Sequence, residues 1–318
     1  MNKIRWGIVS AGTIANTFAS DVAHAANAEL AAVAARSLPS AAGFADKYGI
    51  DRVYEGYDAL FADPDIDAIY VATPHTLHLK NSADALRAGK AVLCEKPITT
   101  SAAECQELLN IAAETGGYLM EAMWTWFLPA MQKAKVWFEA GRIGELRHVK
   151  ADFGYPKRYD PDDRVFNASL AGGCLLDMGI YPIAIARFFA RQTPTDIKVI
   201  SHHAPNGVDD DVVMLFNYDK LVATLATSFR CKLQNTAYII GDKGYIAIPN
   251  CWRASECHLF ELDTCIDSFS DDRSGSGFEF QITAVSDDIL QGRKESAVVT
   301  HAASLAFQQD MDRVRSQF

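Results

Sequence analysis

The sequence lacks the features of a nucleic-acid-binding or membrane protein. Among its 318 residues no run of Lys or Arg occurs, and the formal net charge is −10. An acidic chain without a basic stripe argues against nucleic acid and anionic membrane as main partners. No uninterrupted apolar run approaches the ~18 residues needed to cross a bilayer. We therefore expect no nucleic-acid partner and no membrane partner.

Paired cysteines are also missing. The seven cysteines form no CxxC pair, and the nearest approach to a cluster is Cys251, Cys257 and Cys265, with His258 among them. Their spacings of six and eight fit no zinc pattern, so we expect reduced, structural thiols and no metal. The N-terminal residues MNKIRWGIV pass from a basic start into a strand pattern without a cleavable apolar region, which predicts a cytoplasmic protein.

What the sequence does contain is apolar material, at 49% of its residues, which is ample for a core. One hydrophobic core usually stops growing near ~250–300 residues, so two domains are expected. As far as residue 122, strand patterns alternate with helical ones; the strands are expected at 4–9, 29–36, 67–73, 91–97 and 117–123. This α/β alternation predicts a doubly wound parallel sheet, a Rossmann domain over residues 1–122.

The pattern changes in the second half, where strands follow one another with few helices between them. Strands are expected at 146–153, 208–218, 221–231 and 235–249, and helices at 130–140, 177–190, 277–292 and 302–316. Gly241 to Gly244 read as a hairpin turn. Residues 123–318 are therefore expected to form an α/β domain with a large, mainly antiparallel open sheet. The apolar face of such a sheet would need covering, so we expect a homodimer through it.

The first strand-to-helix turn is SAGTIA, residues 10–15. A dinucleotide fingerprint asks for Gly-x-Gly-x-x-Gly or Ala here, so that the backbone approaches the pyrophosphate and helix N–H groups point at it. Gly12 and Ala15 match, whereas Ser10 stands at the first glycine position. We assign Gly12, Thr13 and Ile14 to cofactor binding, although tight turns also use glycine for steric reasons alone.

The end of the second expected strand carries no acid for the ribose hydroxyls of NAD. Arg36 and Ser37 stand there instead. A guanidinium at this place can hold a 2′-phosphate, so NADP(H) is expected over NAD(H). The alternative is an ordinary surface arginine before a turn.

After the third expected strand comes TPHTLH, residues 73–78. Strand ends in open parallel sheets face the ligand crevice, so Thr73, Pro74, His75 and His78 are expected along the cofactor. Either histidine could equally cap the helix that follows.

The stretch AVLCEKP, residues 91–97, is a buried strand pattern that ends in two opposite charges and a proline. By the same rule Glu95 and Lys96 lie at the cofactor end, where an ammonium can stabilise a developing alkoxide. Pro97 fixes the backbone, and a cis Lys-Pro bond fits this place. The alternative is that Glu95 and Lys96 merely form a salt bridge.

A second polar group stands on the apolar helix expected at 177–190. Asp177 and Tyr181 are four residues apart and share one helix face. Two such side chains are costly in a core unless they are paired. A tyrosine hydroxyl near an ammonium has a lowered pKa and can donate a proton to a carbonyl, while the aspartate can orient the lysine.

The chain resembles the Gfo/Idh/MocA oxidoreductases. The resemblance rests on SAGTIA, on CEKP at 94–97 and on GGCLLDMGIYP at 172–182, and it continues through MEAMWTWFLP (120–129), GVDDDV (207–212) and GDKGYIAIP (241–249). It implies that Lys96 is the catalytic lysine. Many members carry His at the position of Tyr181. A tyrosine there resembles the branch of dimeric dihydrodiol dehydrogenases and NADP-dependent D-xylose dehydrogenases.

The resemblance implies hydride transfer between a nicotinamide and the alcohol or carbonyl carbon of a sugar or trans-dihydrodiol. Trp126 stands where that branch has arginine, which puts a borrowed substrate in doubt. Tyr155, Arg158 and Arg164 are candidate substrate contacts, with solvated loop charges as the alternative for both arginines. Two rival functions stay open: a non-catalytic nucleotide-sensing regulator of the same fold, and a family reductase with a non-sugar substrate.

Overall fold

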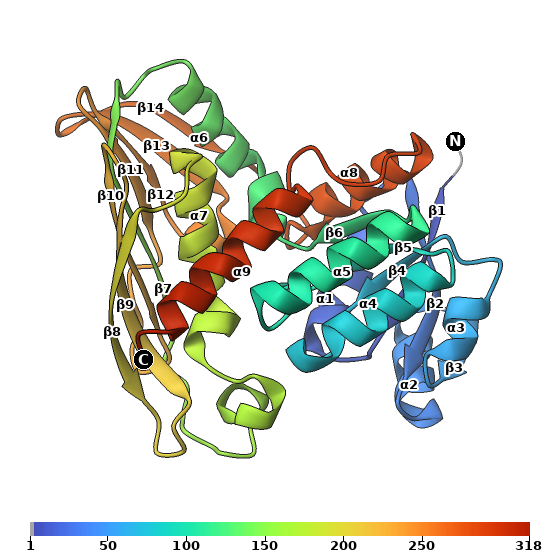
Figure 1. The fold of residues 1–318 in the computed structure, drawn as a ribbon. Coiled ribbons are helices and arrows are strands. Elements are labelled where there is room, and N and C mark those ends of the chain that lie inside the picture. The colour runs from blue at the N-terminus through green and yellow to red at the C-terminus, as the bar shows by residue number, and fades with distance from the viewer. Residues whose placement is uncertain (1–2) are drawn as a thin grey trace. The chain divides into compact units, whose positions relative to one another are not determined.

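The computed structural model describes residues 3–318, which form two compact units. Unit 1 comprises the described residues up to Trp124 and Ser274–Leu305, and unit 2 comprises Thr125–Arg273 and Ala306–Phe318. Each unit has its own sheet, six-stranded in the first and eight-stranded in the second, with helices packed on it (Figure 1). The expected α/β class is confirmed.

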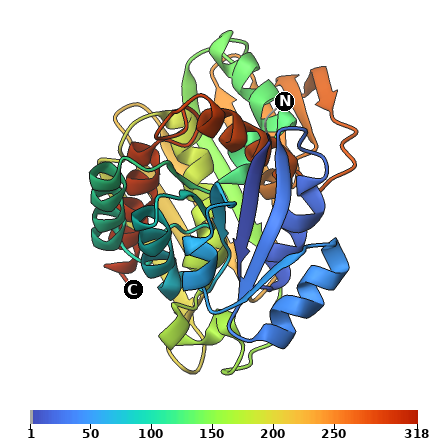
Figure 2. The same cartoon turned by 90° about the vertical axis from the view of Figure 1, so that its right-hand side faces the viewer.

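Unit 1 contains a parallel sheet in the order β3-β2-β1-β4-β5-β6. Its strands are β1 (Ile4–Val9), β2 (Ala28–Ala35), β3 (Arg52–Glu55), β4 (Ala68–Val71), β5 (Ala91–Cys94) and β6 (Leu119–Glu121). Its helices are α1 (Thr13–Val22), α2 (Leu38–Tyr48), α3 (Asp58–Ala62), α4 (His78–Arg87), α5 (Ala102–Thr115) and α8 (Phe278–Leu290). The parallel course of β1 and β2, in dark blue, can be followed in Figure 2. The strand order reverses beside β1, which is where open α/β sheets bind ligands.

Alternate residues of these strands face two separate cores. On one face an apolar cluster runs from Val9 on β1 through Val71 on β4 to Leu108 on α5. On the other face Phe18 of α1 stacks on Tyr70 of β4 with 3.9 Å between ring centroids. Because both faces are covered, the strands read as nearly continuous apolar runs in the sequence.

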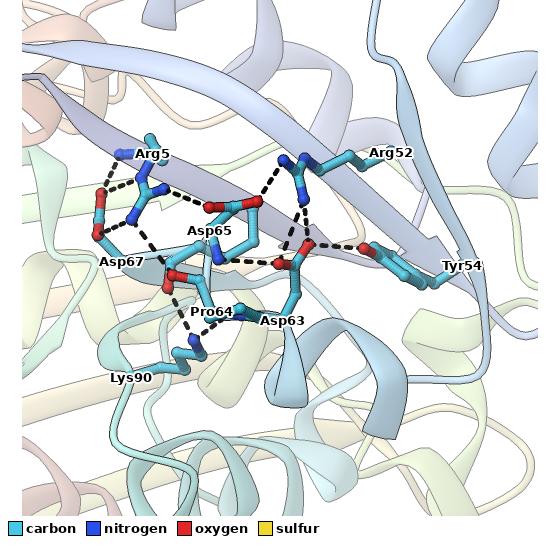
Figure 3. A network of polar contacts seen from close by, with 9 residues as sticks. Arg5, Arg52, Tyr54, Asp63, Pro64, Asp65, Asp67 and Lys90 are labelled. Atoms are coloured by element: carbon cyan, nitrogen blue, oxygen red, sulfur yellow. Dashed lines mark hydrogen bonds and ion pairs between the residues drawn. The ribbon is translucent and has the colours of Figure 1, made fainter.

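The amino ends of the unit 1 strands are joined by an ionic network (Figure 3). Asp63 is buried and accepts hydrogen bonds from Tyr54 Oη at 2.6 Å and Arg52 Nη1 at 3.0 Å, which lower the pKa of its carboxyl. Arg5 pairs with Asp67, and Lys90 Nζ donates to the carbonyl of Ile66 at 2.8 Å. The network joins the strands at their amino ends, whereas the predicted site lies at their carboxyl ends.

Unit 2 contains a mixed sheet in the order β14-β13-β12-β11-β7-β10-β9-β8, in which only β7 and β10 pair in parallel. Its strands are β7 (Leu146–Gly154), β8 (Asp196–His203), β9 (Asp209–Asn217), β10 (Val222–Ser228), β11 (Ala237–Gly241), β12 (Tyr245–Ile248), β13 (Glu256–Glu261) and β14 (Thr264–Ser270). Helices α6 (Pro129–Glu139) and α7 (Ile180–Ala190) lie on the same side of it (Figure 1). The hairpin of β11 and β12, closed by the Gly241 N–H to Gly244 carbonyl bond, is confirmed.

Four strands were not anticipated: β3, β8, β13 and β14. All lie at or next to a sheet edge, where burial is incomplete. In β14 only two of seven positions are even half-buried, so the sequence carries little of the apolar alternation that marks a strand.

The chain returns to unit 1 after residue 273, whereas the expected boundary near residue 122 places this segment in the second domain. Asp21 of α1 holds it there: its carboxylate accepts from the N–H groups of Ser276 and Phe278. Trp6 Nε1 donates to Ser286 Oγ on α8 at 3.2 Å. Helix α9 (His301–Arg315) begins in unit 1 and ends in unit 2.

Residues Ala168–Ala190 are apolar and long enough to cross a membrane by length and composition only, with a mean hydropathy of 1.5. Inside the protein 67% of that window is buried, as in the core helix of a globular protein. The expectation from uninterrupted apolar runs passed over this segment because Asp177 interrupts it.

Candidate active site

The turn between β1 and α1 has the shape that a dinucleotide turn requires. Ser10 has a φ of 98°, a conformation that favours glycine, and its Oγ accepts from the Gly12 N–H at 3.3 Å. Gly12 is the N-cap of α1, and no side chain caps that helix. Thr13 and Ile14 form its first turn, so backbone N–H groups are available at the helix N-terminus. Ser10 thus keeps the turn in the conformation of the missing glycine.

Arg36 and Ser37 are both exposed and follow the carboxyl end of β2, next to β1 in the sheet. Ser37 is the N-cap of α2 in an extended conformation, and its side chain makes no capping bond. Burial raises the pKa of Tyr57, and the Arg36 charge acts in the opposite direction. The Arg36 charge therefore lies within electrostatic range of Tyr57.

The segment after β4 is fixed mainly by His78, whose ring is fully buried. Its Nδ1 contacts the carbonyl of Pro97 and its Nε2 that of Thr73, each at 2.8 Å. His75 is also buried, with its ring centroid 5.7 Å from that of His78. His78 therefore ties the loop after β4, which includes Pro74, to the loop after β5, and both of its nitrogens are engaged by backbone.

Glu95 and Lys96 follow β5 as expected, and the Lys96–Pro97 bond is cis. The Glu95 side chain is buried and accepts from the hydroxyl of Tyr70 and, at 3.2 Å, from the N–H of Lys96. Glu95 thus holds the backbone of the lysine that follows it.

Two further buried carboxyls, one in each unit, were given no role from the sequence alone. Glu121 at the end of β6 accepts from the Ile98 N–H at 2.9 Å, and burial raises its pKa to about 7. In unit 2, Asp209 accepts from the Leu175 N–H at 2.7 Å. The motifs MEAM and DDD contain them, but no local pattern distinguishes these acids from surface ones.

In unit 2 the expected helix begins as a π-helix, Leu175–Gly179, and continues as α7. Asp177 lies on the π segment, and its carboxylate pairs with Lys157 Nζ at 3.3 Å and Arg164 Nη2 at 3.1 Å. Single π turns inside helices are frequent at functional sites. Arg164, expected as a substrate contact, thus also holds the loop before the helix to Asp177.

Tyr181 is 5% exposed and stands against an aromatic wall. The ring of Phe153 lies edge-on to it at 5.4 Å, and Phe153 stacks on Trp252 at 4.9 Å. This wall, made by strand β7 and the turn after β12, brings together residues about 100 positions apart.

The remaining candidate contacts lie on the loop after β7. Arg158 borders a hollow of about 630 Å³ lined by Lys157, Arg158, Tyr159, Asp160, Pro161 and Asp163. Tyr155 packs its ring against Phe153 at 5.9 Å and lies under the Lys232 ammonium at 4.7 Å. Tyr155 therefore extends the aromatic wall.

Trp126 is packed among aromatic side chains of unit 2. It is 6% exposed and packs against Phe188 at 4.8 Å and Phe307 at 5.2 Å between ring centroids. The difference from arginine at this position is thus accommodated by the packing between α7 and α9.

All seven cysteines are free. Within residues 3–318 no group of three or more His, Cys, Asp or Glu side chains is arranged to hold a metal ion.

Comparison with known proteins identifies the family of the chain. Residues 4–123 match the oxidoreductase family model with an NAD-binding Rossmann fold, and residues 131–247 match the Gfo/Idh/MocA C-terminal domain. The chain belongs to the Gfo/Idh/MocA oxidoreductase family. The resemblance inferred from the sequence motifs is thereby confirmed, and unit 1 carries the family's nicotinamide-nucleotide domain.

Within the Gfo/Idh/MocA family, the chain is similar to trans-1,2-dihydrobenzene-1,2-diol dehydrogenases. It is 40% identical to the mouse enzyme over 80% of this chain and 77% of that one. It is 35% identical to the human enzyme over 98% of this chain and 96% of that one.

Solved structures of the same fold include the 3-ketoreductase KijD10 from Actinomadura kijaniata in complex with NADP and TDP-benzene, with a TM-score of 0.87 and 28% identity over 99% of this chain and 98% of that one. The aldose-aldose oxidoreductase from Caulobacter crescentus has a TM-score of 0.91 at 24% identity, over 99% and 97% of the two chains, and supports the fold alone.

The residues of unit 1 fit a nicotinamide dinucleotide. The uncapped helix N-terminus after Gly12 can receive a pyrophosphate, and a Cβ on Gly12 would meet only Ser10 Oγ, at 3.5 Å. The segments after β4 and β5 stand at the reversal of strand order, where the rest of the cofactor belongs.

Proposed function

We propose that the protein is an NADP(H)-dependent dehydrogenase or reductase that interconverts an alcohol and a carbonyl carbon of a sugar or a trans-dihydrodiol. When bound, the nicotinamide supplies or accepts the hydride. The observation that carries the proposal is the aromatic wall beside Tyr181, because it sets a titratable hydroxyl against flat apolar surfaces that suit a ring-shaped alcohol. The names of the dihydrodiol dehydrogenases that the chain resembles support the same substrate class.

Three side chains carry the proposed chemistry. Tyr181 donates a proton to the carbonyl oxygen in reduction and accepts it in oxidation. Lys96 stabilises the negative charge that develops on that oxygen. Asp177 orients the catalytic lysine, and its carboxylate already pairs with the cations of Lys157 and Arg164.

Cofactor preference is proposed from Arg36 and Ser37, which stand exposed where NAD enzymes place an acid. Gly12, Thr13 and Ile14 would receive the pyrophosphate. Thr73, Pro74, His75, His78 and Glu95 form the two loops along the cofactor, with His78 and Glu95 holding backbone.

Substrate contacts are proposed for Tyr155, Arg158 and Arg164. Tyr155 continues the aromatic wall, and Arg158 borders the hollow of the loop after β7. Seven free cysteines support a reducing compartment, the cytoplasm.

A homodimer through the sheet of unit 2 is proposed from its outer face. Ile200 is 71% exposed and pairs with Val213, which is 46% exposed. Leu215, also 46% exposed, and Val222, 38% exposed, extend the same surface. We propose that a second copy covers this apolar band.

Turnover and cofactor binding of Tyr181→Phe test the proposed chemistry. The loss of the proton donor should lower kcat by about 10²–10⁴-fold and leave NADPH affinity nearly unchanged. Tyr245→Phe, which removes a hydroxyl elsewhere in unit 2, is the control and should keep wild-type turnover. A Tyr181→Phe variant with most of its rate would remove this residue from the mechanism.

Fluorescence titration of Arg36→Ala with NADPH and NADH tests the cofactor preference. A lost charge-assisted contact of ~1.5–3 kcal/mol should weaken NADPH binding by about 10- to 150-fold, with NADH binding nearly unchanged. Arg87→Ala, an exposed arginine at the end of α4, controls for the loss of surface charge. Equal losses for both nucleotides would contradict the assignment of Arg36 to a 2′-phosphate.

A further inference from the structure

Glu121 is a buried acid beside the lysine loop, the segment 95–98 that follows β5 and carries Lys96. It ends β6 and is 1% exposed. In the parallel register it stands opposite Cys94, whose carbonyl accepts from the Ala122 N–H at 2.7 Å. Leu119, two residues earlier on the strand, belongs to the apolar core under α4 and α5. The Glu121 carboxyl therefore lies on the core side of the sheet, next to the residues that follow Cys94, which are Glu95 and Lys96.

The carboxyl has one specific partner in that loop. Its Oε1 accepts from the Ile98 N–H at 2.9 Å. Proline has no N–H, so Ile98 supplies the first backbone donor after Lys96. Together with the contact of Pro97 to His78, this bond holds the backbone on the far side of the lysine.

Three side chains thus hold three consecutive residues of the loop: Glu95 the N–H of Lys96, His78 the carbonyl of Pro97, and Glu121 the N–H of Ile98. Of these supports, only Glu121 comes from β6. It fixes the loop to the neighbouring strand.

Electrostatics link the same groups. Burial raises the pKa of Glu121 to about 7, while the Ser304 hydroxyl and the Ile98 N–H oppose that rise. The charge of Glu95 also raises this pKa and that of Lys96 lowers it. Lys96 therefore lies within electrostatic range of Glu121. The Glu121 side chain is 1% exposed, and it hydrogen-bonds to the backbone of the loop.

We propose that Glu121 is a positioning residue for Lys96: through the Ile98 N–H it fixes the loop backbone and so the direction in which the lysine leaves the sheet. The inference rests on the proposed catalytic role of Lys96. It adds a residue of β6 to the machinery without placing it among the groups that touch the ligand.

Three substitutions separate the hydrogen bond from the charge. Glu121→Gln keeps a carbonyl oxygen that can accept from Ile98, and Glu121→Leu removes the acceptor while keeping the volume. Glu121→Asp keeps the carboxyl but draws it back by one methylene, which provides a soluble variant if leucine prevents folding. Amide hydrogen exchange of Ile98 is the direct readout, because it does not depend on activity.

The leucine and aspartate variants should exchange the Ile98 amide about tenfold or more faster than wild type, with the glutamine variant near wild type. In the same two variants kcat should fall by about tenfold or more, with KM and NADPH affinity within about threefold. Wild-type exchange at Ile98 in both variants would overturn the proposal, as would equal losses of kcat in the glutamine and leucine variants.

A Lys96→Met background distinguishes this proposal from the proposed function. If Lys96→Met keeps wild-type turnover, the catalytic role of the lysine fails, and the inference fails with it even where the Ile98 exchange rate changes. If Lys96→Met lowers kcat, adding Glu121→Leu should lower it no further, because both changes act through one group. A further tenfold loss in the double variant would show that Glu121 acts elsewhere.

Discussion

Gly173 stands at the start of the helix that carries Asp177 and Tyr181, and replacing it with alanine tests how that helix is anchored. Gly173 has a φ of 132°, outside the region that side chains tolerate. A Cβ there would lie 2.1 Å from Oδ1 of Asp209. The Asp209 carboxylate is buried and accepts from the Leu175 N–H at 2.7 Å. Gly173→Ala must therefore strain the backbone and displace the carboxylate that anchors the helix.

The magnitude follows from these two effects. A residue held in a sparsely populated backbone conformation costs ~1–3 kcal/mol. A buried N–H left without its acceptor costs ~1–3 kcal/mol. We expect Gly173→Ala to lower the free energy of unfolding by roughly 3–5 kcal/mol, which for a unit of this size lowers Tm by about 6–20 °C. Turnover should fall as well, since Leu175 leads into the turn that carries Asp177.

Calorimetry and chemical denaturation measure the loss, and Gly141→Ala is the matched control in the same unit. Gly141 also has a positive φ, 68°, but a Cβ there would meet nothing within 4 Å. The control should cost only ~1–2 kcal/mol, the ordinary penalty of the left-handed conformation. Equal losses for the two variants would refute the role of the Asp209 contact.

Three further predictions concern stability and assembly. The pKa of Glu121 is raised from 4.5 to about 7, so the contribution of its protonated form to stability is complete below pH 4.5 and is lost as the pH rises through 7. Glu121→Gln cannot titrate, so between these pH values its unfolding free energy should fall by about 2–3 kcal/mol less than that of wild type. An unchanged pH dependence of the unfolding free energy, measured in urea, contradicts this. Asp63→Ala takes the acceptor from the half-buried Tyr54 hydroxyl and from Arg52, and should cost ~1–3 kcal/mol. Exposed Asp65→Ala should cost under about 1 kcal/mol, and equal thermal shifts for the two variants would discount the network. Leu215→Asp should convert a dimer to monomer in sedimentation, unlike Val136→Asp on α6, and identical sedimentation of the two variants argues against the sheet interface.

Local patterns predicted the parts of the fold in which each residue's role depends on its near neighbours. The helices at 130–140 and 277–292 correspond to α6 and α8 within two residues at each end, because apolar spacing and end signals lie inside the segment. The hairpin at 241–244 was predicted for the same reason. Edge strand β14 was missed, since its exposed, polar residues carry no alternation.

The residues of the candidate site also fall into those that local sequence could identify and those that it could not. Lys96 could be placed at a strand end because an apolar strand, a charge pair and Pro97 are adjacent in the sequence. The importance of Asp209 could not be recognised, because its partner Leu175 lies 34 residues away and its neighbours are also aspartates. The packing of Trp126 against Phe188 and Phe307 could not be recognised either, because the three residues lie far apart in the sequence.

The sequence by itself determined the doubly wound first domain, the open sheet of the second, the nucleotide turn at Gly12 and the candidate residues Lys96 and Tyr181. Only the tertiary structure decided that residues 274–305 join unit 1, that Glu121 holds the lysine loop and that Phe153 and Trp252 form a wall beside Tyr181. Periodicity and turn chemistry depend on residues a few positions apart, so they can be recognised in a short segment of the sequence. The burial of an acid or the meeting of two distant rings depends on which segments pack together, and that choice minimises the free energy of a whole unit.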